Sequence, residues 1–191
     1  MRKKTDKGAR KNRHTDLSYK VFIKNEKHLE TLLEEKKDNN LFFLVLDGIQ
    51  DPHNLGACLR SADAAGVDAV IVPKDRAVSL TETVRKIACG AAENVMFIQV
   101  TNLADAIRKM KESGVWFFGT SDRATQSIYE VDLTGSIAIV IGSEANGIRN
   151  LTTKLCDHLI SIPMAGTVEC LNASVATGVS LFEAVRQRLK K

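Results

Sequence analysis

Three short stretches of the chain combine amides, carboxylates, hydroxyls and arginine with glycine. They are D-G-I-Q-D-P-H-N-L-G-A-C-L-R at 47–60, G-S-E-A-N-G-I-R at 142–149 and P-M-A-G-T-V-E-C-L-N-A-S at 163–174. Amides and hydroxyls donate or accept hydrogen bonds, and an arginine can hold a carboxylate or a phosphate with two parallel bonds. Glycine lets backbone approach a ligand closely. The stretches predict a ligand site built from hydrogen bonds, with a backbone-lined pocket suited to a neutral or zwitterionic molecule.

Each stretch also has a simpler interpretation. Asn54 could only cap the helix that follows it, Glu144 could be a solvated acid in a glycine turn, and Asn172 could only cap the closing helix. Taken alone, each simple interpretation is as good as the functional one. Because all three stretches follow predicted strands, and the carboxyl ends of parallel strands share one edge of a sheet, we expect them to converge there.

The elements that must position these stretches follow from the apolar pattern. Buried strands are expected at 41–46, 69–72, 95–100, 115–119, 137–141 and 159–162, and helices at 55–65, 81–92 (interrupted near Gly90), 103–113 and after Asn172. Weaker signals suggest a strand at 19–23 and a helix at 28–37. Strands that alternate with helices of about ten residues imply an α/β fold with a parallel sheet flanked by helices.

The closing helix carries a row of apolar residues at steps of three and four. They are Val175, Val179, Phe182, Val185 and Leu189. This spacing predicts one apolar face of an amphipathic helix. Near its start, Ala176, Thr177 and Gly178 are small enough to let another helix approach closely, as in a homodimer.

Composition narrows the class of protein. A chain of 191 residues with 44% hydrophobic and 26% charged residues is typical of one soluble globular domain. No apolar run is long enough to span a bilayer, and the N-terminus lacks the apolar core of a signal peptide. Four scattered cysteines indicate reduced thiols, and Cys156 with His158 is too small a set for a zinc site, so we expect a cytoplasmic protein without metal. Neither a Gly-x-Gly-x-x-Gly fingerprint nor a phosphate-binding Gly-Lys-Ser/Thr loop follows the first strand.

The charge is distributed unevenly along the chain. Residues 1–20 hold eight Lys or Arg against two Asp, a net +6, so the other 171 residues carry −2 within the overall +4. A basic arm on a nearly neutral body predicts a polyanionic partner, most simply nucleic acid. The alternative is a solvated tail that contributes only solubility.

The polar stretches resemble a known family. N-L-G-A-C-L-R, I-G-S-E-A-N-G-I and I-P-M-A-G-T-V-E-C-L-N-A-S-V-A look like the three motifs of the SpoU-type (TrmH-like) RNA ribose 2′-O-methyltransferases of the SPOUT class, in the same order. The resemblance covers about residues 41–188. D-P-H-N-L-G-A-C-L-R-S-A-D-A-A-G-V and the following P-K-D-R are most similar to the bacterial branch that methylates a guanosine ribose in 23S ribosomal RNA.

The resemblance implies a fold, a cofactor and a set of site residues. The fold is a parallel α/β sheet with a C-terminal deep trefoil knot, the cofactor is S-adenosyl-L-methionine, and the enzyme is a homodimer that packs around the closing helix and acts on RNA. The implied catalytic positions are Asn54, Arg60, Glu144, Asn172 and Ser174, and the implied cofactor contacts are Thr120, Gly142, Ile162 and Leu171. Arg60 could act in two ways, as a phosphate clamp, which we favour, or as the base that receives the hydroxyl proton.

We expect a basic arm at 1–20, a short linker or helical segment at 21–40 and the methyltransferase domain at 41–191. The chain departs from many relatives at Cys170, where they have Ser, and at Ala173, where they have Val. Relatives of the ribosomal branch also carry an N-terminal RNA-binding domain, for which forty residues are too few. Two alternative functions remain open, ribose methylation of transfer RNA and a non-catalytic RNA-binding module in ribosome assembly.

Overall fold

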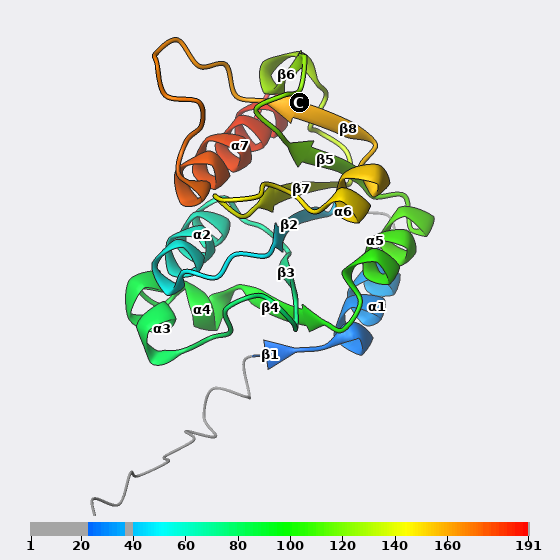
Figure 1. The fold of residues 1–191 in the computed structure, drawn as a ribbon. Coiled ribbons are helices and arrows are strands. Elements are labelled where there is room, and N and C mark those ends of the chain that lie inside the picture. The colour runs from blue at the N-terminus through cyan, green and yellow to red at the C-terminus, as the bar shows by residue number, and fades with distance from the viewer. Residues whose placement is uncertain (1–22, 37–39, 191) are drawn as a thin grey trace, which may run out of the picture.

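A single eight-stranded sheet runs through the molecule, with helices on both faces (Figure 1). The computed structural model describes residues 23–36 and 40–190, so the predicted basic arm at 1–20 and all but Ile23 of the predicted strand at 19–23 lie outside the described residues. The strand order is β1-β4-β3-β2-β7-β5-β8-β6, and every recorded strand pair is parallel. The predicted α/β fold with a parallel sheet is confirmed.

The expected strands and helices are present with small shifts of their ends. The strands are β1 (Ile23–Lys24), β2 (Phe42–Asp47), β3 (Ala69–Pro73), β4 (Met96–Val100), β5 (Trp116–Thr120), β6 (Gln126–Ser127), β7 (Ile137–Gly142) and β8 (His158–Ser161). The helices are α1 (Glu26–Glu35), α2 (Pro52–Ala64), α3 (Glu82–Ala88), α4 (Ala91–Asn94), α5 (Leu103–Glu112), α6 (Asn150–Leu155) and α7 (Ala173–Arg188), with a 3-10 turn η2 (Ile128–Glu130). Of these, β6, η2 and α6 were not expected, because such short segments show no apolar period.

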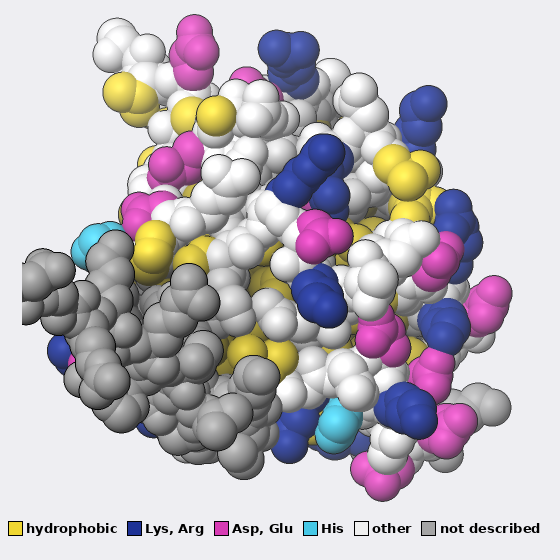
Figure 2. Space-filling view, turned by 60° about the horizontal axis from the view of Figure 1, so that its bottom comes forward, with side chains coloured by type: hydrophobic (Ala, Val, Ile, Leu, Met, Phe, Trp, Pro, Cys, Tyr) yellow, Lys and Arg dark blue, Asp and Glu magenta, His cyan; other side chains and the backbone are white. Residues whose placement is uncertain are grey.

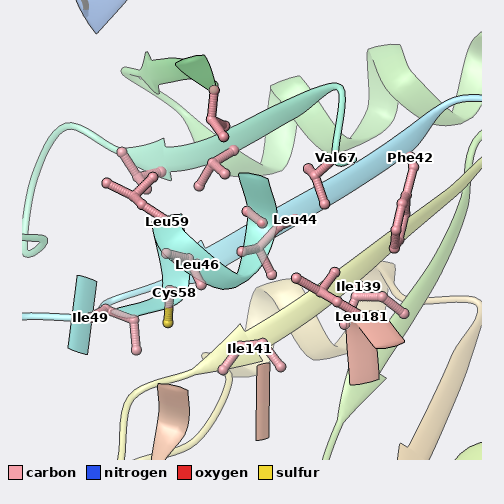
Figure 3. Packing of buried hydrophobic residues seen from close by; sticks show 14 of the residues in the cluster. Phe42, Leu44, Leu46, Ile49, Cys58, Leu59, Val67, Ile139, Ile141 and Leu181 are labelled. Carbon is pink, nitrogen blue, oxygen red and sulfur yellow. The ribbon is translucent and has the colours of Figure 1, made fainter. Parts of the chain in front are cut away.

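Alternate residues of the central strand β2 feed two separate cores. Phe42, Leu44 and Leu46 pack on the face covered by α2, α3, α4 and α7, part of which is shown in Figure 3. Phe43 and Val45 pack on the other face, together with apolar residues of α1 and α5. Burial on both faces explains why β2 is an unbroken apolar run instead of an alternating one. The described part of the segment 21–40 shares this second core, because α1 buries Leu29, Leu32 and Leu33 there.

The order of the strands creates a crevice at the centre of the sheet. From β2 the chain moves outward to β3 and β4, whereas β7 lies on the other side of β2 and is followed by β8 farther out. The segment after β2 leads to α2 on one face, and the segment after β7 leads to α6, which contacts α5 on the opposite face. Loops that leave neighbouring strands toward opposite faces leave an opening between them, where α/β proteins bind ligands.

The closing helix α7 buries a different face from its apolar row. Its buried residues are Ala173, Thr177, Ser180, Leu181, Glu183 and Ala184. In the apolar row, Val175, Phe182 and Leu189 are 50%, 49% and 82% exposed. These three residues face outward, whereas Val179 and Val185 are half-buried and Val185 packs against the core, so the predicted amphipathic face is buried only in part. The small residues on the inner side of α7 allow close packing against the helix α2 of the same chain.

The contact between α2 and α7 is close at Thr177. Its hydroxyl donates to the carbonyl of Ala173 over 2.8 Å and lies 3.3 Å from the sulfur of Cys58 on α2. Burial raises the pKa of the Cys58 thiol to about 11, so this thiol stays protonated at neutral pH. Gly178 also faces α2, since a Cβ placed there would lie 3.7 Å from the hydroxyl of Ser61.

The far end of α7 is held by Arg188. Its guanidinium donates to the carbonyls of Leu133, Asn40, Leu41 and Gly135 at 2.7–3.2 Å and lies 4.4 Å from the ring centre of Phe42. Burial lowers the pKa of Arg188 below its ordinary value. The C-terminal end of the helix is thereby fixed to the start of β2 and to the residues before β7, which orients its N-terminal end toward the carboxyl edge.

Candidate active site

Three of the predicted catalytic side chains meet at the carboxyl ends of β2 and β7. The amide of Asn54 donates to Oε1 of Glu144 over 3.0 Å, and the amide of Asn172 donates to Oδ1 of Asn54 over 3.0 Å and to the same Glu144 oxygen. The backbone N–H of Ala173 also points to Glu144, at 3.4 Å. The three residues come from positions 90 and 28 residues apart in the chain. Their convergence confirms the expectation that the three stretches meet at one edge.

Asn54 is free for this contact because another residue caps its helix. The N-cap of α2 is Asp51, whose carboxylate accepts from the N–H of His53 over 2.9 Å, and Pro52 fills the first turn. The simpler interpretation of Asn54 as an N-cap is therefore wrong. Asn54 lies in the first turn of the helix, 8% exposed, and its amide points toward the loop after β7.

Asn172 does cap α7, and the cap fixes the direction of its amide. Its Oδ1 accepts from the N–H groups of Ser174 and Val175 at 2.9 and 3.4 Å and from the Ser174 hydroxyl at 2.6 Å. With the oxygen held by the helix end, the NH₂ group of the same amide faces Asn54 and Glu144. The structural and functional interpretations of Asn172 are thus compatible, and Ser174 supports Asn172 directly.

The loop that carries Glu144 is held by an ion pair that sequence reasoning missed. Asp47, the buried last residue of β2, accepts from the backbone N–H and the Nε of Arg149 at 3.0 and 2.5 Å, and from its Nη2 at 2.5 Å. Within the loop, Ser143 and Gly147 form a pair of backbone hydrogen bonds. The signal was present in the sequence, because Asp47 is a charged residue that ends an otherwise apolar strand.

Gly142 makes the tight return of this loop possible. A Cβ at Gly142 would lie 2.0 Å from the carbonyl carbon of Gly147 and 2.1 Å from the nitrogen of Ile148. Gly147 itself has φ +63°, a left-handed conformation that favours glycine. The space beside Gly142 is therefore filled by the chain's own backbone, and any other residue would displace the loop that holds Glu144.

A pocket of about 250 Å³ lies beside the cluster of Asn54, Glu144 and Asn172. It is lined by Gly48, Ile49, Gln50, Asp51, Asn54, Ser143, Glu144, Ala145 and Asn146. The lining comes from the loops after β2 and β7, on either side of the central crevice. Backbone, amides and carboxylates dominate it, which suits a polar ligand that is recognised by hydrogen bonds.

Arg60 lies outside this cluster. It is exposed on α2, and its guanidinium donates to the sulfur of Cys89 over 3.8 Å. Six residues of helix separate it from Asn54, a rise of about 9 Å and a turn to a different side of the helix. The structure brings together Asn54, Glu144, Asn172 and Ser174 but does not bring Arg60 to them.

The predicted cofactor contacts lie at the ends of three adjacent strands. Thr120 ends β5, Gly142 ends β7, and Ile162 directly follows β8, with β5 between the other two in the sheet. The Thr120 hydroxyl donates to the carbonyl of Val140 over 3.1 Å, which ties β5 to β7. Leu171 is half-buried and directly precedes Asn172. These four residues offer mainly backbone groups and apolar side chains next to the cluster, and no carboxylate. Such groups suit an organic cofactor better than a metal cation.

A second cavity in the described chain lacks this chemistry. A larger cavity of about 430 Å³, lined by Trp116, His158, Glu130 and neighbours, contains none of the predicted site residues. Among residues 23–36 and 40–190, no three His, Cys, Asp or Glu side chains are grouped as metal ligands. No helix in the same ranges has the length and apolar character of a membrane span.

Residues 41–182 match the model of the SpoU rRNA methylase family. The chain is 61% identical over 165 residues to the 23S rRNA (guanosine-2′-O-)-methyltransferase RlmB of Vibrio cholerae. The aligned residues make up 86% of this chain and 66% of that protein. It is also 60% identical over 147 residues to RlmB of Escherichia coli, and this alignment covers 77% of this chain and 60% of that protein. The chain thus spans slightly less than two thirds of the length of these curated relatives.

Solved structures of the same family share the fold. The SpoU methyltransferase AviRb from Streptomyces viridochromogenes, in complex with AdoMet, has a TM-score of 0.75 at 28% identity over 80% of this chain and 62% of its own. A TrmH/SpoU tRNA modifying enzyme from A. aeolicus has a TM-score of 0.73 at 27% identity over 85% of each chain. The matching family model, the sequence identities and the shared fold together show that this chain belongs to the SpoU rRNA methylase family.

Proposed function

We propose that the protein transfers a methyl group from S-adenosyl-L-methionine to a ribose 2′-hydroxyl of RNA, at a guanosine of 23S ribosomal RNA. The observation that carries the proposal is the hydrogen-bonded cluster of Asn54, Glu144 and Asn172, which gathers one residue from each motif stretch at the edge of one pocket. The identity of about 60% to proteins named as guanosine-2′-O-methyltransferases supports the choice of substrate. The fold shared with an AdoMet-bound SpoU enzyme supports the choice of cofactor.

The cofactor would supply a methyl group already activated as a sulfonium, so the residues of the chain need only align and deprotonate the hydroxyl. Glu144 is fixed by the amides of Asn54 and Asn172 and by a backbone N–H, so it does not reorganise when the substrate enters. Asn54, Asn172 and Ser174 offer hydrogen bonds that orient the ribose and its phosphate. Thr120, Gly142, Ile162 and Leu171 hold the cofactor at the adjoining strand ends.

Arg60 is assigned to the RNA phosphate, as a clamp. A guanidinium is a poor base but binds phosphate through two parallel hydrogen bonds. Its exposed place on α2 supports contact with a strand that runs from the pocket onto this helix. The alternative, in which Arg60 gives up its own proton and becomes the base, stays open and predicts a different pH dependence.

The finer features of the family are part of the proposal. We propose a C-terminal trefoil knot, a cytoplasmic location and a homodimer that packs around α7. The exposed row of Val175, Phe182 and Leu189 supports the homodimer, because apolar side chains spaced by seven residues share one helix face and gain stability when a second copy covers them. The small residues at the start of α7 do not support it, since Thr177 packs against α2 of the same chain.

A second candidate function keeps the chemistry and changes the RNA. The similarity in fold to a TrmH/SpoU tRNA modifying enzyme favours transfer RNA as the alternative substrate. A non-catalytic RNA-binding module, the third possibility, predicts RNA affinity without cofactor binding. The complete cluster at the pocket argues against this third possibility, because a vestigial site does not need to retain it.

Two measurements test the proposal together. Calorimetry with S-adenosylhomocysteine should give a one-site isotherm without RNA, and mass spectrometry should show one 2′-O-methylguanosine missing from 23S ribosomal RNA of cells that lack the chain. Loss of a methyl group from transfer RNA instead would favour the second candidate. No binding heat at protein concentrations of tens of micromolar, together with unchanged RNA, would overturn the methyltransferase assignment.

A further inference from the structure

Eight of the seventeen Lys and Arg side chains in the described part of the protein form ion pairs with nearby acids. Ion pairs join Lys36 to Asp68, Arg85 to Glu93, Lys86 to Glu82, Arg108 to Asp105, Lys109 to Glu30, Lys111 to Asp157, Arg149 to Asp47 and Arg186 to Glu183. Figure 2 shows basic and acidic side chains interspersed over much of one face. Cations paired in this way contribute little to binding a polyanion, so the unpaired cations near the pocket are the candidates for such a contact.

Lys74 and Arg76, two of the cations without such an ion pair, lie in the loop that joins β3 to α3. Both side chains are exposed, and neither makes an ion pair or side-chain hydrogen bond with the described residues. Asp75 lies between them, so the tripeptide carries a net +1. An exposed, unpaired guanidinium keeps all five of its N–H donors available for an anion.

The loop around Arg76 is firmly anchored at both ends. The N–H of Lys74 donates to the carbonyl of Val100 over 2.8 Å, and the N–H of Val78 donates to the carbonyl of Ile49 over 2.9 Å. The next residue, Ser79, accepts from the side chain of Gln99 over 3.2 Å. Fixed backbone on either side means that Arg76 is presented from a defined position, which lowers the entropy lost when it binds.

Arg76 also adopts a backbone conformation that its side chain disfavours. Its φ is +59°, in the left-handed region, and Cys89 is the other non-glycine residue with positive φ among the described residues. A glycine at position 76 would hold the same loop shape with less strain. Strain of this kind persists where surrounding contacts enforce it and is concentrated at functional sites.

The position of the loop connects it with the pocket. The hydrogen bond to Ile49 joins it to the pocket lining, and a Cβ at Gly48, another lining residue, would lie 3.9 Å from the Arg76 carbonyl oxygen. In the sheet, β3 is separated from β7 by β2, a distance of about 10 Å. The proposed cofactor residues begin at β7 and lie on the far side of it, so the loop of Arg76 contacts the pocket lining on the side opposite these residues.

We infer that Arg76, assisted by Lys74, binds a backbone phosphate of the RNA strand next to the target nucleotide and so sets the direction in which the strand crosses the pocket. This inference rests on the proposed function for the RNA substrate. A phosphate matches the site because it takes parallel hydrogen bonds from a guanidinium and a charge from the adjacent ammonium group. Such a contact carries no base specificity and positions the strand.

The test compares Arg76→Gly with the parent chain and with Lys154→Ala. The Gly variant removes the guanidinium and keeps the left-handed backbone, and Lys154 is an exposed cation on α6, remote from the pocket, for which the structure also shows no bond to described residues. The probe is unmethylated 23S ribosomal RNA made by transcription, titrated at several salt concentrations. We expect Arg76→Gly to raise the RNA dissociation constant about fivefold and to lower the salt slope by about 1, and Lys154→Ala to change neither by comparable amounts.

Three further readouts separate the possible failures. Arg76→Gly should not lower the midpoint of thermal unfolding and should leave S-adenosylhomocysteine binding unchanged. It should raise KM for RNA more than it lowers kcat. Arg76→Lys should have an RNA affinity between those of Arg76→Gly and the parent chain. Parental RNA affinity and salt slope in Arg76→Gly would overturn the phosphate contact even if methyl transfer by the parent is intact. A parent chain that binds RNA but transfers no methyl group would defeat the proposed function and leave the binding comparison decisive for Arg76. A parent chain that binds no RNA would overturn both.

Discussion

At the scale of single residues, Asn172 performs two tasks with one side chain. Its amide oxygen caps α7 by accepting the N–H groups of Ser174 and Val175, and its NH₂ group donates to Asn54 and Glu144. Because an amide is planar, fixing the oxygen also fixes the NH₂ group. The position of Glu144 is therefore coupled to the start of the last helix, and the two tasks can be separated by mutation.

Asn172→Ser should retain the cap and lose the donor. Serine is about as good an N-cap as asparagine, so the midpoint of thermal unfolding should change by no more than a few degrees. Methyl transfer measured in a single turnover should fall about a hundredfold, because a preorganised donor is lost from the site. The matched control is Asn102→Ser at the N-cap of α5, which should not change the rate. Equal rates in the two variants would contradict a role for the Asn172 amide.

Arg60 can be tested by removal and by a conservative change. Arg60→Ala should abolish methyl transfer and leave cofactor binding and the fold intact, since its side chain is exposed and its guanidinium donates only to Cys89 among the hydrogen bonds of the described residues. Arg60→Lys should lower activity heavily at all pH values if Arg60 is a clamp, because lysine lacks the planar fork. If Arg60 is the base, activity of the Lys variant should rise toward pH of about 10. A pH–rate profile decides between the two, and a near-parental rate in Arg60→Ala would sink both.

At the scale of elements, the segment between β7 and α6 decides where Glu144 stands. This segment turns back over Gly142, closes with hydrogen bonds between Ser143 and Gly147, and is fastened to β2 by the pair of Asp47 and Arg149. Together they make a short loop rigid, because its two ends and its turn are all tied to the sheet.

Gly142→Ala should therefore damage the site more than an added methyl group ordinarily does. The new Cβ would overlap the backbone of Gly147 and Ile148 at 2.0 and 2.1 Å, so the loop must move. S-adenosylhomocysteine binding should be lost in calorimetry, and stability should fall by about 1–3 kcal/mol as for other overpacked sites. Gly135→Ala is the control, since nothing lies within 4 Å of its Cβ position. Parental cofactor affinity in Gly142→Ala would refute the role given to this loop.

Helix α7 exposes Val175, Phe182 and Leu189 of its apolar row, so the proposed dimer can be tested at one residue. Phe182 is 49% exposed at the centre of the row between Val175 and Leu189. Phe182→Glu should leave the monomer folded, because the side chain is outside the core, and should shift the sedimentation profile from dimer to monomer at micromolar concentration. Lys190→Glu, an exposed charge change after the helix, serves as the control. A parent chain that sediments as a monomer would remove the basis of the dimer proposal.

At the scale of the whole molecule, positive charge and the folded pocket lie in different parts of the chain. The body after residue 20 carries a net −2, and many of its cations are paired on the helices, whereas residues 1–20 carry a net +6. We therefore expect nonspecific affinity for RNA to depend mainly on the first twenty residues. We expect orientation at the pocket to depend on unpaired cations of the body near it.

Removal of residues 1–20 should weaken RNA binding without loss of the pocket. Each phosphate contact contributes about 0.7–0.9 to the dependence of log affinity on log salt, so eight cations lost should flatten the slope by up to about 6. S-adenosylhomocysteine affinity should stay the same, because the pocket lies in the sheet domain. The measurement is a filter-binding titration at several salt concentrations, and an unchanged slope would mean that these residues contribute only solubility.

The sequence by itself determined the parallel sheet, most of its strands and helices, and the convergence of three polar stretches, because apolar periodicity and the shared carboxyl edge of parallel strands are local or topological rules. Tertiary structure alone decided which atoms meet. The sequence allowed Asn54 to be the N-cap of α2, but the structure shows that Asp51 is the N-cap. Arg60, six residues farther along the same helix, contacts Cys89 and not the cluster. Likewise, the spacing of the apolar row on α7 predicted one buried face, but only the packing showed that Val175, Phe182 and Leu189 are exposed while Val185 contacts the core. Periodicity fixes which residues share a side of an element, and the neighbours that arrive from distant parts of the chain decide which side is covered.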